Sequence, residues 1–374
     1  MAGIYIHVPF CRSRCIYCGF YSTTLESLRH DYVEAVCKEM KMRRNYIKDV
    51  FQTIYIGGGT PSLLDGCELQ AIFAYIYKVF AVGDDPEVTI ECNPDDVTPG
   101  FASMLSSLPI NRVSMGAQTF SDKRLDFLHR RHSATEVGRA VGILRLAGIR
   151  NISIDLMFGF PEETLDDWRY DLDKAVDLDV EHISAYSLMY EDGTRLWSMR
   201  KSGSIKEIDD DLSLAMYDEL CRVLDKAGYE HYEISNFAKP GFRSRHNSSY
   251  WNLTPYIGIG AAAHSFDIKS RQWNVSDVRR YIDSINSGKL LVEREILDDD
   301  TAYDDVITTA LRTKEGVSLG LIRERFGEKY VRLLTTLSKK YVDTGLLDAS
   351  DGYVRLTQKG IYVSDAIMSD LMSV

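Results

Sequence analysis

Short apolar, β-branched runs alternate with amphipathic segments over the first two thirds of the chain, and this alternation restricts the fold more than any other feature. The predicted strands lie at residues 3–8, 53–57, 87–92, 111–116, 151–157 and 182–188. The segments between them predict helices at 30–47, 66–80, 99–107, 121–147 and 163–178, with a further helix at 207–228. Strands that alternate with helices favour a parallel sheet with right-handed crossovers. Six such units predict an open, partial version of the eight-stranded α/β barrel.

Polar and glycine-rich motifs follow five of these strands at the point where each strand ends. They are the segment from Cys11 to Cys18, Gly57-Gly58-Gly59-Thr60-Pro61, Glu91-Cys92-Asn93-Pro94, Gly116-Ala117-Gln118 and the stretch around Asp155 and Gly159. In an α/β barrel the carboxyl ends of the strands form the face that carries the active site. The five motifs are therefore expected to build one site.

Cys11, Cys15 and Cys18 form a C-x3-C-x2-C motif directly after the first predicted strand. Three clustered thiolates are able to hold three irons of a cubane [4Fe–4S] cluster, which leaves the fourth iron without a protein ligand. An open metal position accepts an exchangeable small molecule, as in catalytic zinc sites. The alternative is a zinc site, but zinc normally takes four ligands and no matching cysteine pair follows in the sequence. The spacing favours the cluster.

Charge and the other cysteines restrict the class of protein. The net charge is −11, whereas a nucleic-acid-binding protein normally concentrates basic residues on one face. Seven cysteines, of which only three are clustered, are a poor disulfide framework and suit a reducing compartment. The N-terminus lacks the basic and apolar regions of a signal peptide, and the most hydrophobic helical stretch, 71–82, is too short to span a bilayer. These features predict a cytoplasmic protein.

Four polar side chains near the strand ends are candidates for ligand contacts. Glu91 and Gln118 are suited to hydrogen bonds with hydroxyl or ammonium groups. Arg130 is suited to bidentate pairing with a carboxylate, or it is a solvated arginine at a helix end. Asp155 lies in mid-strand among apolar neighbours, which favours a ligand contact over a structural salt bridge. The glycine run 57–59 permits the close approach of a ligand, or forms a tight turn.

The pattern changes after about residue 235, which indicates a second, smaller domain. A loop-rich stretch is followed by helices expected near 275–287, 300–313 and 329–344. Residues 345–360 are typical of a short β-hairpin before a final helix, an order like that of a winged helix. We therefore expect a core domain at 1–235 and a mostly helical, winged-helix-like domain at 236–374 that packs on it.

Taken together, the motifs resemble those of a known family. They are Ile6-His-Val-Pro-Phe-Cys11 with the cysteine triplet, Gly57-Gly-Gly-Thr-Pro61, Glu91-x-Asn-Pro94, Gly116-Ala-Gln-Thr-Phe120 and Asp155-Leu-Met-Phe-Gly-Phe-Pro161. This set is similar to the oxygen-independent coproporphyrinogen III oxidase (HemN) family of the radical S-adenosylmethionine (SAM) superfamily, over essentially the whole chain. The resemblance implies a partial (β/α)6 radical SAM barrel, a HemN-type C-terminal domain, a [4Fe–4S] cluster on the three cysteines and SAM on its open iron.

The same resemblance implies which residues contact SAM. The matching positions are Tyr5, Tyr17, Gly58, Gly59, Thr60, Glu91, Gln118, Arg130, Asp155 and Met189. No clear motif anchors Met189. Aromatic residues beside the cysteines are also suited to shield a cluster, and burial around a cluster tunes its potential. A packing role is the alternative for Tyr5.

Two departures from the oxidases point to another branch. True oxidases of the family carry a further cysteine two residues after the triplet, where this chain has Phe20. They also begin with a substantial N-terminal extension, whereas this chain starts ten residues before Cys11. Both features resemble instead the HemW branch, the haem chaperones. That resemblance implies haem as a further cofactor, and haem-accepting proteins, such as respiratory enzymes at the membrane, as partners.

Two histidines are candidates for contacts with haem. The HemW branch carries a His-Asn-x-x-Tyr-Trp motif, present here from His246 to Trp251. An imidazole is able to ligate haem iron, and the aromatic rings offer flat apolar faces to a macrocycle. The alternative is a histidine that caps a turn, with its aromatic neighbours in an interdomain core. His264 is a second candidate, for haem or for the SAM pocket, whereas His7 is expected to be structural.

Three functions are considered. The resemblance to HemW implies a cytoplasmic haem-trafficking protein that binds a [4Fe–4S] cluster, SAM and haem. The alternative is an oxidase that cleaves SAM reductively to a 5′-deoxyadenosyl radical, which abstracts hydrogen from coproporphyrinogen propionates before decarboxylation. Phe20 and the short N-terminus count against the oxidase, and catalysis on another substrate stays open. DNA binding through the C-terminal hairpin is disfavoured, because its acidic and basic residues are balanced.

Overall fold

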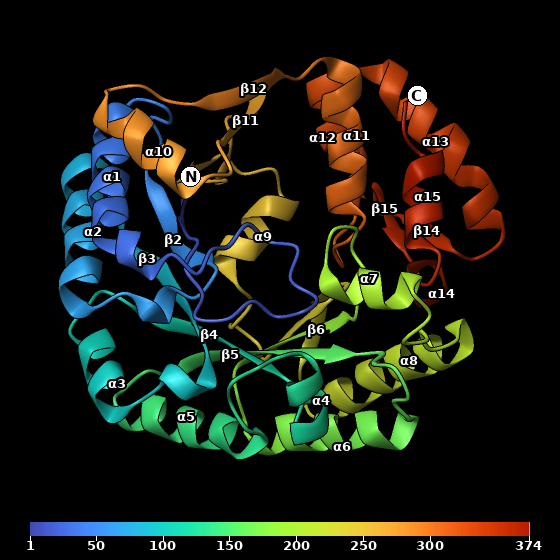
Figure 1. Cartoon of the computed structure of the whole chain (residues 1–374). Coiled ribbons are helices and arrows are strands. Elements are labelled where there is room, and N and C mark those ends of the chain that lie inside the picture. The colour runs from blue at the N-terminus through green and yellow to red at the C-terminus, as the bar shows by residue number, and fades with distance from the viewer. Residues whose placement is uncertain (374) are drawn as a thin grey trace.

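The computed structural model describes residues 1–373 and is built on one twelve-stranded sheet (Figure 1). Six parallel strands stand side by side in chain order at its centre: β1 (Ala2–Val8), β2 (Phe51–Gly58), β3 (Val82–Cys92), β4 (Arg112–Gln118), β5 (Asn151–Phe158) and β6 (His182–Ser187). The predicted fold class, a partial (β/α)6 barrel with a smaller, mostly helical C-terminal part, is confirmed.

Helices that follow these strands form an outer layer around the barrel (Figure 1). They are α1 (Arg29–Met42), α2 (Gly66–Val79), α3 (Pro99–Ser106), α5 (Ala134–Leu146), α6 (Leu165–Asp177) and α8 (Asp210–Lys226). The short helices α4 (Asp122–Phe127) and α7 (Arg195–Lys201) follow β4 and β6 and pack near the cysteine loop. The start of α2 shows how the sequence sets a helix boundary, because Asp65 and Glu68 form a reciprocal capping box. Its buried face, with Leu69, Ile72 and Ile76, then packs against the sheet core.

The two faces of the parallel strands differ in polarity. Successive side chains of a strand point to opposite sides of the sheet. One set, which includes Ile54, Ile90 and Ile154, is buried in the main hydrophobic core. The alternate positions carry polar side chains that line the interior of the barrel, among them Tyr55, Glu91, Ser114, Asp155 and Ser184. The barrel therefore has an apolar outer face for the helices and a polar inner face for a site.

The sheet continues beyond the six parallel strands on both sides. On one side β9 (Tyr256–Ile259) pairs with β1 in parallel, and β10 (His264–Phe266), β11 (Ser270–Asn274) and β12 (Val292–Ile296) follow as antiparallel strands. On the other side β8 (Asn236–Ala238) and β7 (Glu230–Glu233) extend β6. α10 (Val278–Asn286) packs against α1. The predicted domain boundary at 235/236 stays a prediction, and the shared sheet reaches Ile296.

The C-terminal segment has a hydrophobic core of its own, which includes Tyr303, Ile322 and Leu334. Its elements are α11 (Asp299–Ala310), β13 (Val317–Ser318), α12 (Leu319–Phe326), α13 (Glu328–Asp343), β14 (Leu347–Ser350), β15 (Tyr353–Leu356), α14 (Gln358–Ile361) and α15 (Ser364–Asp370). The strands form a small sheet in the order β13-β15-β14. The expected hairpin and final helix are present, in the winged-helix-like order.

Three helical details differ from the sequence expectation. The single helix expected at 121–147 is interrupted between α4 and α5, because His129 adopts a left-handed backbone with φ of 60° and Ser133 starts a new helix with a capping box to Glu136. The sequence did not predict α7, α9 (Arg245–Trp251) or α12 (Leu319–Phe326). Short 3₁₀ turns lie at Glu26–Leu28, Pro61–Leu63 and Pro94–Asp96. Among residues 1–373 no helix is long and apolar enough to cross a membrane.

Candidate functional site

A cavity of about 420 Å³ lies at the carboxyl ends of the barrel strands. Most of the residues that the sequence assigned to a site line this cavity: Cys11, Cys15, Tyr17, Cys18, Gly58, Gly59, Thr60, Glu91, Gln118, Arg130, Asp155 and Met189. They come from separate strand ends and meet because the strands are parallel. Tyr5, His246 and His264 do not line it.

The cysteine loop, residues 11–18, forms one wall of the cavity. Thr60 donates a hydrogen bond to Cys11 Sγ at 3.5 Å, and Arg130 Nη1 donates one to Cys15 Sγ at 3.7 Å. Burial raises the pKa of Cys18 to about 11. No three His, Cys, Asp or Glu side chains in residues 1–373 are gathered around a point suited to one metal ion. In a cubane [4Fe–4S] cluster each thiolate binds a different iron, so the three sulfurs do not need to converge on one point. The three cysteines, two of which accept hydrogen bonds at sulfur, therefore fit such a cluster.

A small hydrophobic core supports the cysteine loop from behind. Ile16, between the second and third cysteines, packs there with Leu128, Phe160 and Leu196. The backbone reinforces this contact, because Ile16 N–H donates to Leu128 O at 3.3 Å and Leu196 N–H donates to Ile16 O at 2.9 Å. Residues that follow β4, β5 and β6 therefore hold the loop together.

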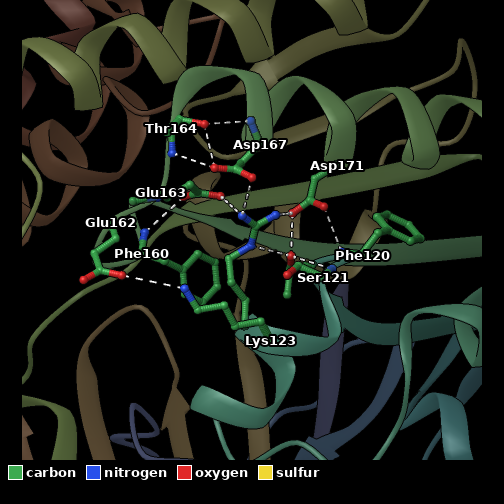
Figure 2. Close-up of polar contacts among 12 residues, drawn as sticks. Phe120, Ser121, Lys123, Phe160, Glu162, Glu163, Thr164, Asp167 and Asp171 are labelled. Atoms are coloured by element: carbon green, nitrogen blue, oxygen red, sulfur yellow. Dashed lines mark hydrogen bonds and ion pairs between the residues drawn. The ribbon is translucent and has the colours of Figure 1, made fainter.

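A buried charge cluster fixes two of these supporting segments (Figure 2). The Glu163 carboxylate accepts hydrogen bonds from the backbone N–H of Gly159 at 2.7 Å and of Phe160 at 3.0 Å. Arg124 lies between Glu163, 3.6 Å away, and Asp171, 3.1 Å away. Burial raises the pKa of Glu163 to about 7. Because Phe160 belongs to the core behind the cysteine loop, the cluster positions that core.

The glycine motif forms a tight turn against β1. Gly58 has φ of 113°, which favours glycine, and Gly59 N–H donates to Val8 O at 2.8 Å. A Cβ on Gly59 would lie 2.8 Å from Phe10 O, so a side chain does not fit there. The glycine run therefore forms the tight turn that was one of its two predicted roles. Gly58 and Gly59 also line the cavity, as the other role, close approach of a ligand, requires.

Glu91 lies at the centre of the polar inner wall. Its carboxylate accepts hydrogen bonds from Tyr55 Oη at 2.7 Å and from Gly58 N–H at 2.9 Å. Burial raises the pKa of Glu91 to about 7, although both hydrogen bonds act in the opposite direction. The carboxylate is therefore near its point of half-ionisation at neutral pH.

Arg130 is part of the cavity wall and not a solvated arginine at a helix end. Its Nη2 donates to Asn93 Oδ1 at 2.7 Å and to Gly116 O at 2.8 Å. Asn93 in turn donates to Thr60 at 3.5 Å, so a chain of hydrogen bonds connects Arg130 with the residue that contacts Cys11. The sequence could not show this, because it depends on the turn at His129 that ends α4.

Asp155 is held within the barrel by polar neighbours. Burial raises the pKa of Asp155, and the hydroxyls of Ser184 and Ser114 and the guanidinium of Arg112 counteract that shift. Ser114, Ser184 and Tyr186 also line the cavity, and the sequence reasoning missed them. The available signal was the polar residue at every second position of the strands, as in Arg112-x-Ser114-x-Gly116 and His182-x-Ser184-x-Tyr186.

His246 belongs to α9, which contacts β1 and β2 and stands near the centre of the barrel in Figure 1. Its Nδ1 is 2.8 Å from Thr53 Oγ1 and its Nε2 is 2.9 Å from Tyr250 Oη, so both ring nitrogens have partners. The side chain is 1% exposed, and burial lowers the pKa of His246 to about 3. The imidazole is therefore neutral, and a role as haem ligand stays a prediction.

Tyr5 and His264 also lie outside the cavity wall. Tyr5 Oη is 2.9 Å from His7 Nδ1, and the second ring nitrogen of His7 is 3.0 Å from Tyr21 O. His7 is thus buried and hydrogen bonded on both sides. His264 is an exposed residue of β10 whose ring stacks on Trp273 with 5.7 Å between the centroids.

Comparison with known proteins gives consistent findings. Residues 5–175 match the Radical SAM superfamily and residues 297–363 match the HemN C-terminal domain. The chain is 31% identical to the haem chaperone HemW of Lactococcus lactis, with 98% of this chain and 96% of the relative covered. It is 34% identical to HemW of Bacillus subtilis, with 96% of each protein covered. Coproporphyrinogen III oxidase (HemN) from Escherichia coli shares the fold, with a TM-score of 0.85 at 20% identity over 100% of this chain and 90% of that one.

Proposed function

The chain belongs to the haem chaperone HemW family of radical SAM proteins, and from this membership we propose that it binds haem and delivers it to other proteins. One observation carries the proposal. A chain similar to haem chaperones over almost its whole length gathers three cysteines and the polar ends of its barrel strands around one cavity. A cavity of this kind, with a few convergent polar groups, is typical of a cofactor site.

The proposed ligands of a [4Fe–4S] cluster are Cys11, Cys15 and Cys18. When bound, such a cluster supplies one-electron chemistry and an iron open to a further ligand. Thr60 and Arg130 donate hydrogen bonds to two of the three sulfurs, and such donors tune a cluster's potential. The three thiols and their donors thus fit a cluster of this type.

The proposed SAM contacts lie on the polar inner wall beside the cysteine loop. Gly58 and Gly59 line the cavity, and the carboxylates of Glu91 and Asp155 line it too and are able to accept hydrogen bonds from hydroxyl or ammonium groups. The other proposed contacts are Tyr17, Thr60, Gln118, Arg130 and Met189. The predicted contacts of Tyr5 with SAM, and of His264 with SAM or haem, stay predictions, since neither residue lines the cavity.

We also propose the compartment and the partners. All seven cysteines are free thiols in the structure, which supports a reducing compartment such as the cytoplasm. The proposed partners are haem-accepting proteins, including respiratory enzymes at the membrane surface. The proposal of these partners rests on membership of the HemW family.

Turnover of coproporphyrinogen III tests the proposal against the oxidase alternative. The anaerobically reconstituted protein is incubated with SAM, a reductant and coproporphyrinogen III, beside a genuine oxidase as the control. We expect no protoporphyrinogen from a sample with an intact cluster and bound SAM. Formation of protoporphyrinogen at a rate comparable to the control would overturn the chaperone function and make Phe20 a tolerated change.

A further inference from the structure

Three large apolar side chains stand exposed around the mouth of the cavity. Phe20 is 69% exposed, Met189 59% and Tyr186 39%, and all three line the cavity. Phe20 follows the cysteine loop, whereas Tyr186 is the last residue but one of β6 and Met189 lies just beyond that strand. Segments far apart in the sequence thus bring apolar surface together at one place. Exposed apolar side chains that line one cavity among polar residues are typical of a binding site.

This apolar mouth differs in kind from the inner wall. Glu91, Asp155, Ser114 and Ser184 make the inner wall polar. A cavity of about 420 Å³ suits one molecule of drug size, and the polar groups proposed for SAM lie deep inside it. A second, larger ligand therefore has room only at the mouth.

Among residues 1–373, the unpaired charges at the mouth are two guanidinium groups and one carboxylate, that of the exposed Glu191. Arg12 and Arg14 line the cavity with exposed side chains, and within residues 1–373 neither guanidinium is paired with a carboxylate. Of the acidic residues at the cavity, Asp95 is paired with Arg131 at 2.7 Å, and Glu191 lies beside Gly19. An apolar face next to two free guanidinium groups is complementary to a flat, apolar ligand that carries carboxylates.

We propose that haem docks at this mouth, with its macrocycle against Phe20 and Tyr186 and its propionates toward Arg12 and Arg14. The inference rests on the proposed function and adds the place where haem is held. Aromatic faces stack on a macrocycle, and guanidinium groups bind carboxylates through paired hydrogen bonds. A side chain of a type that ligates haem iron lines the same cavity, the exposed imidazole of His129. His246, by contrast, is buried with both ring nitrogens in use.

Haem titration by absorption spectroscopy tests the docking site, with the cluster reconstituted and SAM present at saturation. The variants are Phe20→Ala with Tyr186→Ala, and Arg12→Ala with Arg14→Ala. Tyr170→Ala is the matched control, because Tyr170 is an aromatic residue of α6 that is 52% exposed away from the cavity. We expect both double variants to bind haem about tenfold more weakly or worse, while the control binds like the wild type. Iron content and SAM affinity show that the double variants are folded.

Three other outcomes are informative. Haem affinity equal to the wild type in both double variants would overturn the docking site and leave the chaperone function in place. Displacement of haem by SAM in the wild type would assign the mouth to SAM and would also overturn the site. A wild type that binds no haem would overturn the proposed function itself, and this inference with it.

Discussion

The guanidinium of Arg130 donates a hydrogen bond to the thiol of Cys15, with 3.7 Å between Nη1 and Sγ. The other nitrogen of the same fork bonds Asn93 and the carbonyl of Gly116. Arg130, which lies between α4 and α5, thus connects Gly116 of β4 with the cysteine loop after β1. The guanidinium therefore acts on the electrostatics of the proposed cluster as well as on its position.

Arg130→Ala is expected to lower the reduction potential of the reconstituted cluster. A fixed positive charge beside a thiolate ligand stabilises the more negative, reduced state, and its removal reverses that effect. The measurement is a redox titration followed by electron paramagnetic resonance. Arg139→Ala, a surface pair partner on α5, is the control and should leave the potential unchanged. An unchanged or higher potential in Arg130→Ala would remove Arg130 from the surroundings of the cluster.

SAM affinity is expected to rise with pH between 6 and 8. Burial raises the pKa of Glu91 to about 7, so its carboxyl is mostly protonated at pH 6 and mostly ionised at pH 8. The ionised form is the better acceptor for hydroxyl and ammonium groups, and the affinity should increase by up to about tenfold across this range. Equilibrium binding of SAM at several pH values measures it. Glu91→Gln should bind SAM more weakly and lose this pH dependence, and an identical profile in that variant would contradict the assignment.

The sequence alone was sufficient to predict the barrel and most of the residues that line the cavity. Motifs at strand ends carry that information, because parallel strands bring Cys11, Gly58 and Glu91 to one face whatever the helices do. The placement of Arg130 and of His246 was not accessible in the same way. It depends on a left-handed turn at His129 and on a short helix, α9, that enters the barrel from a loop-rich segment. Tertiary packing decides both features, and neither has a periodic pattern.

Arg124→Ala is expected to destabilise the fold at pH 8 by about 3–5 kcal/mol, because it leaves the buried carboxylates of Glu163 and Asp171 without their cation. The loss should be smaller at pH 5. Burial raises the pKa of Glu163 to about 7, so its carboxyl is mostly protonated at pH 5 and leaves less unpaired charge. Burial also raises the pKa of Asp171, which acts in the same direction. Urea denaturation at both pH values measures this.

The surface variant Arg139→Ala is again the control, and it should change the free energy of unfolding by less than about 0.5 kcal/mol. An equally small change for Arg124→Ala would mean that the charge cluster does not hold the loops behind the cysteines.

His246→Ala is expected to reduce stability by about 2–4 kcal/mol and to leave the haem Soret band unchanged. The substitution opens a cavity in the barrel and leaves the hydroxyls of Thr53 and Tyr250 without their partner. Thermal denaturation and haem absorption spectra measure the two effects, with the exposed His30→Ala as control. An altered Soret band in His246→Ala alone would identify this histidine as an iron ligand and require a rearrangement of α9.

Transfer of haem to an acceptor protein is the most direct test of the proposed chaperone function. The protein is loaded with one equivalent of haem, with its cluster and SAM in place, and is mixed with a haem-free b-type cytochrome. We expect the spectrum of the loaded protein to decay as that of the holo-cytochrome appears, and the Phe20→Ala, Tyr186→Ala variant to take up less haem in the loading step under the same conditions. No saturable haem binding by the wild type, or no transfer from the loaded protein, would contradict it.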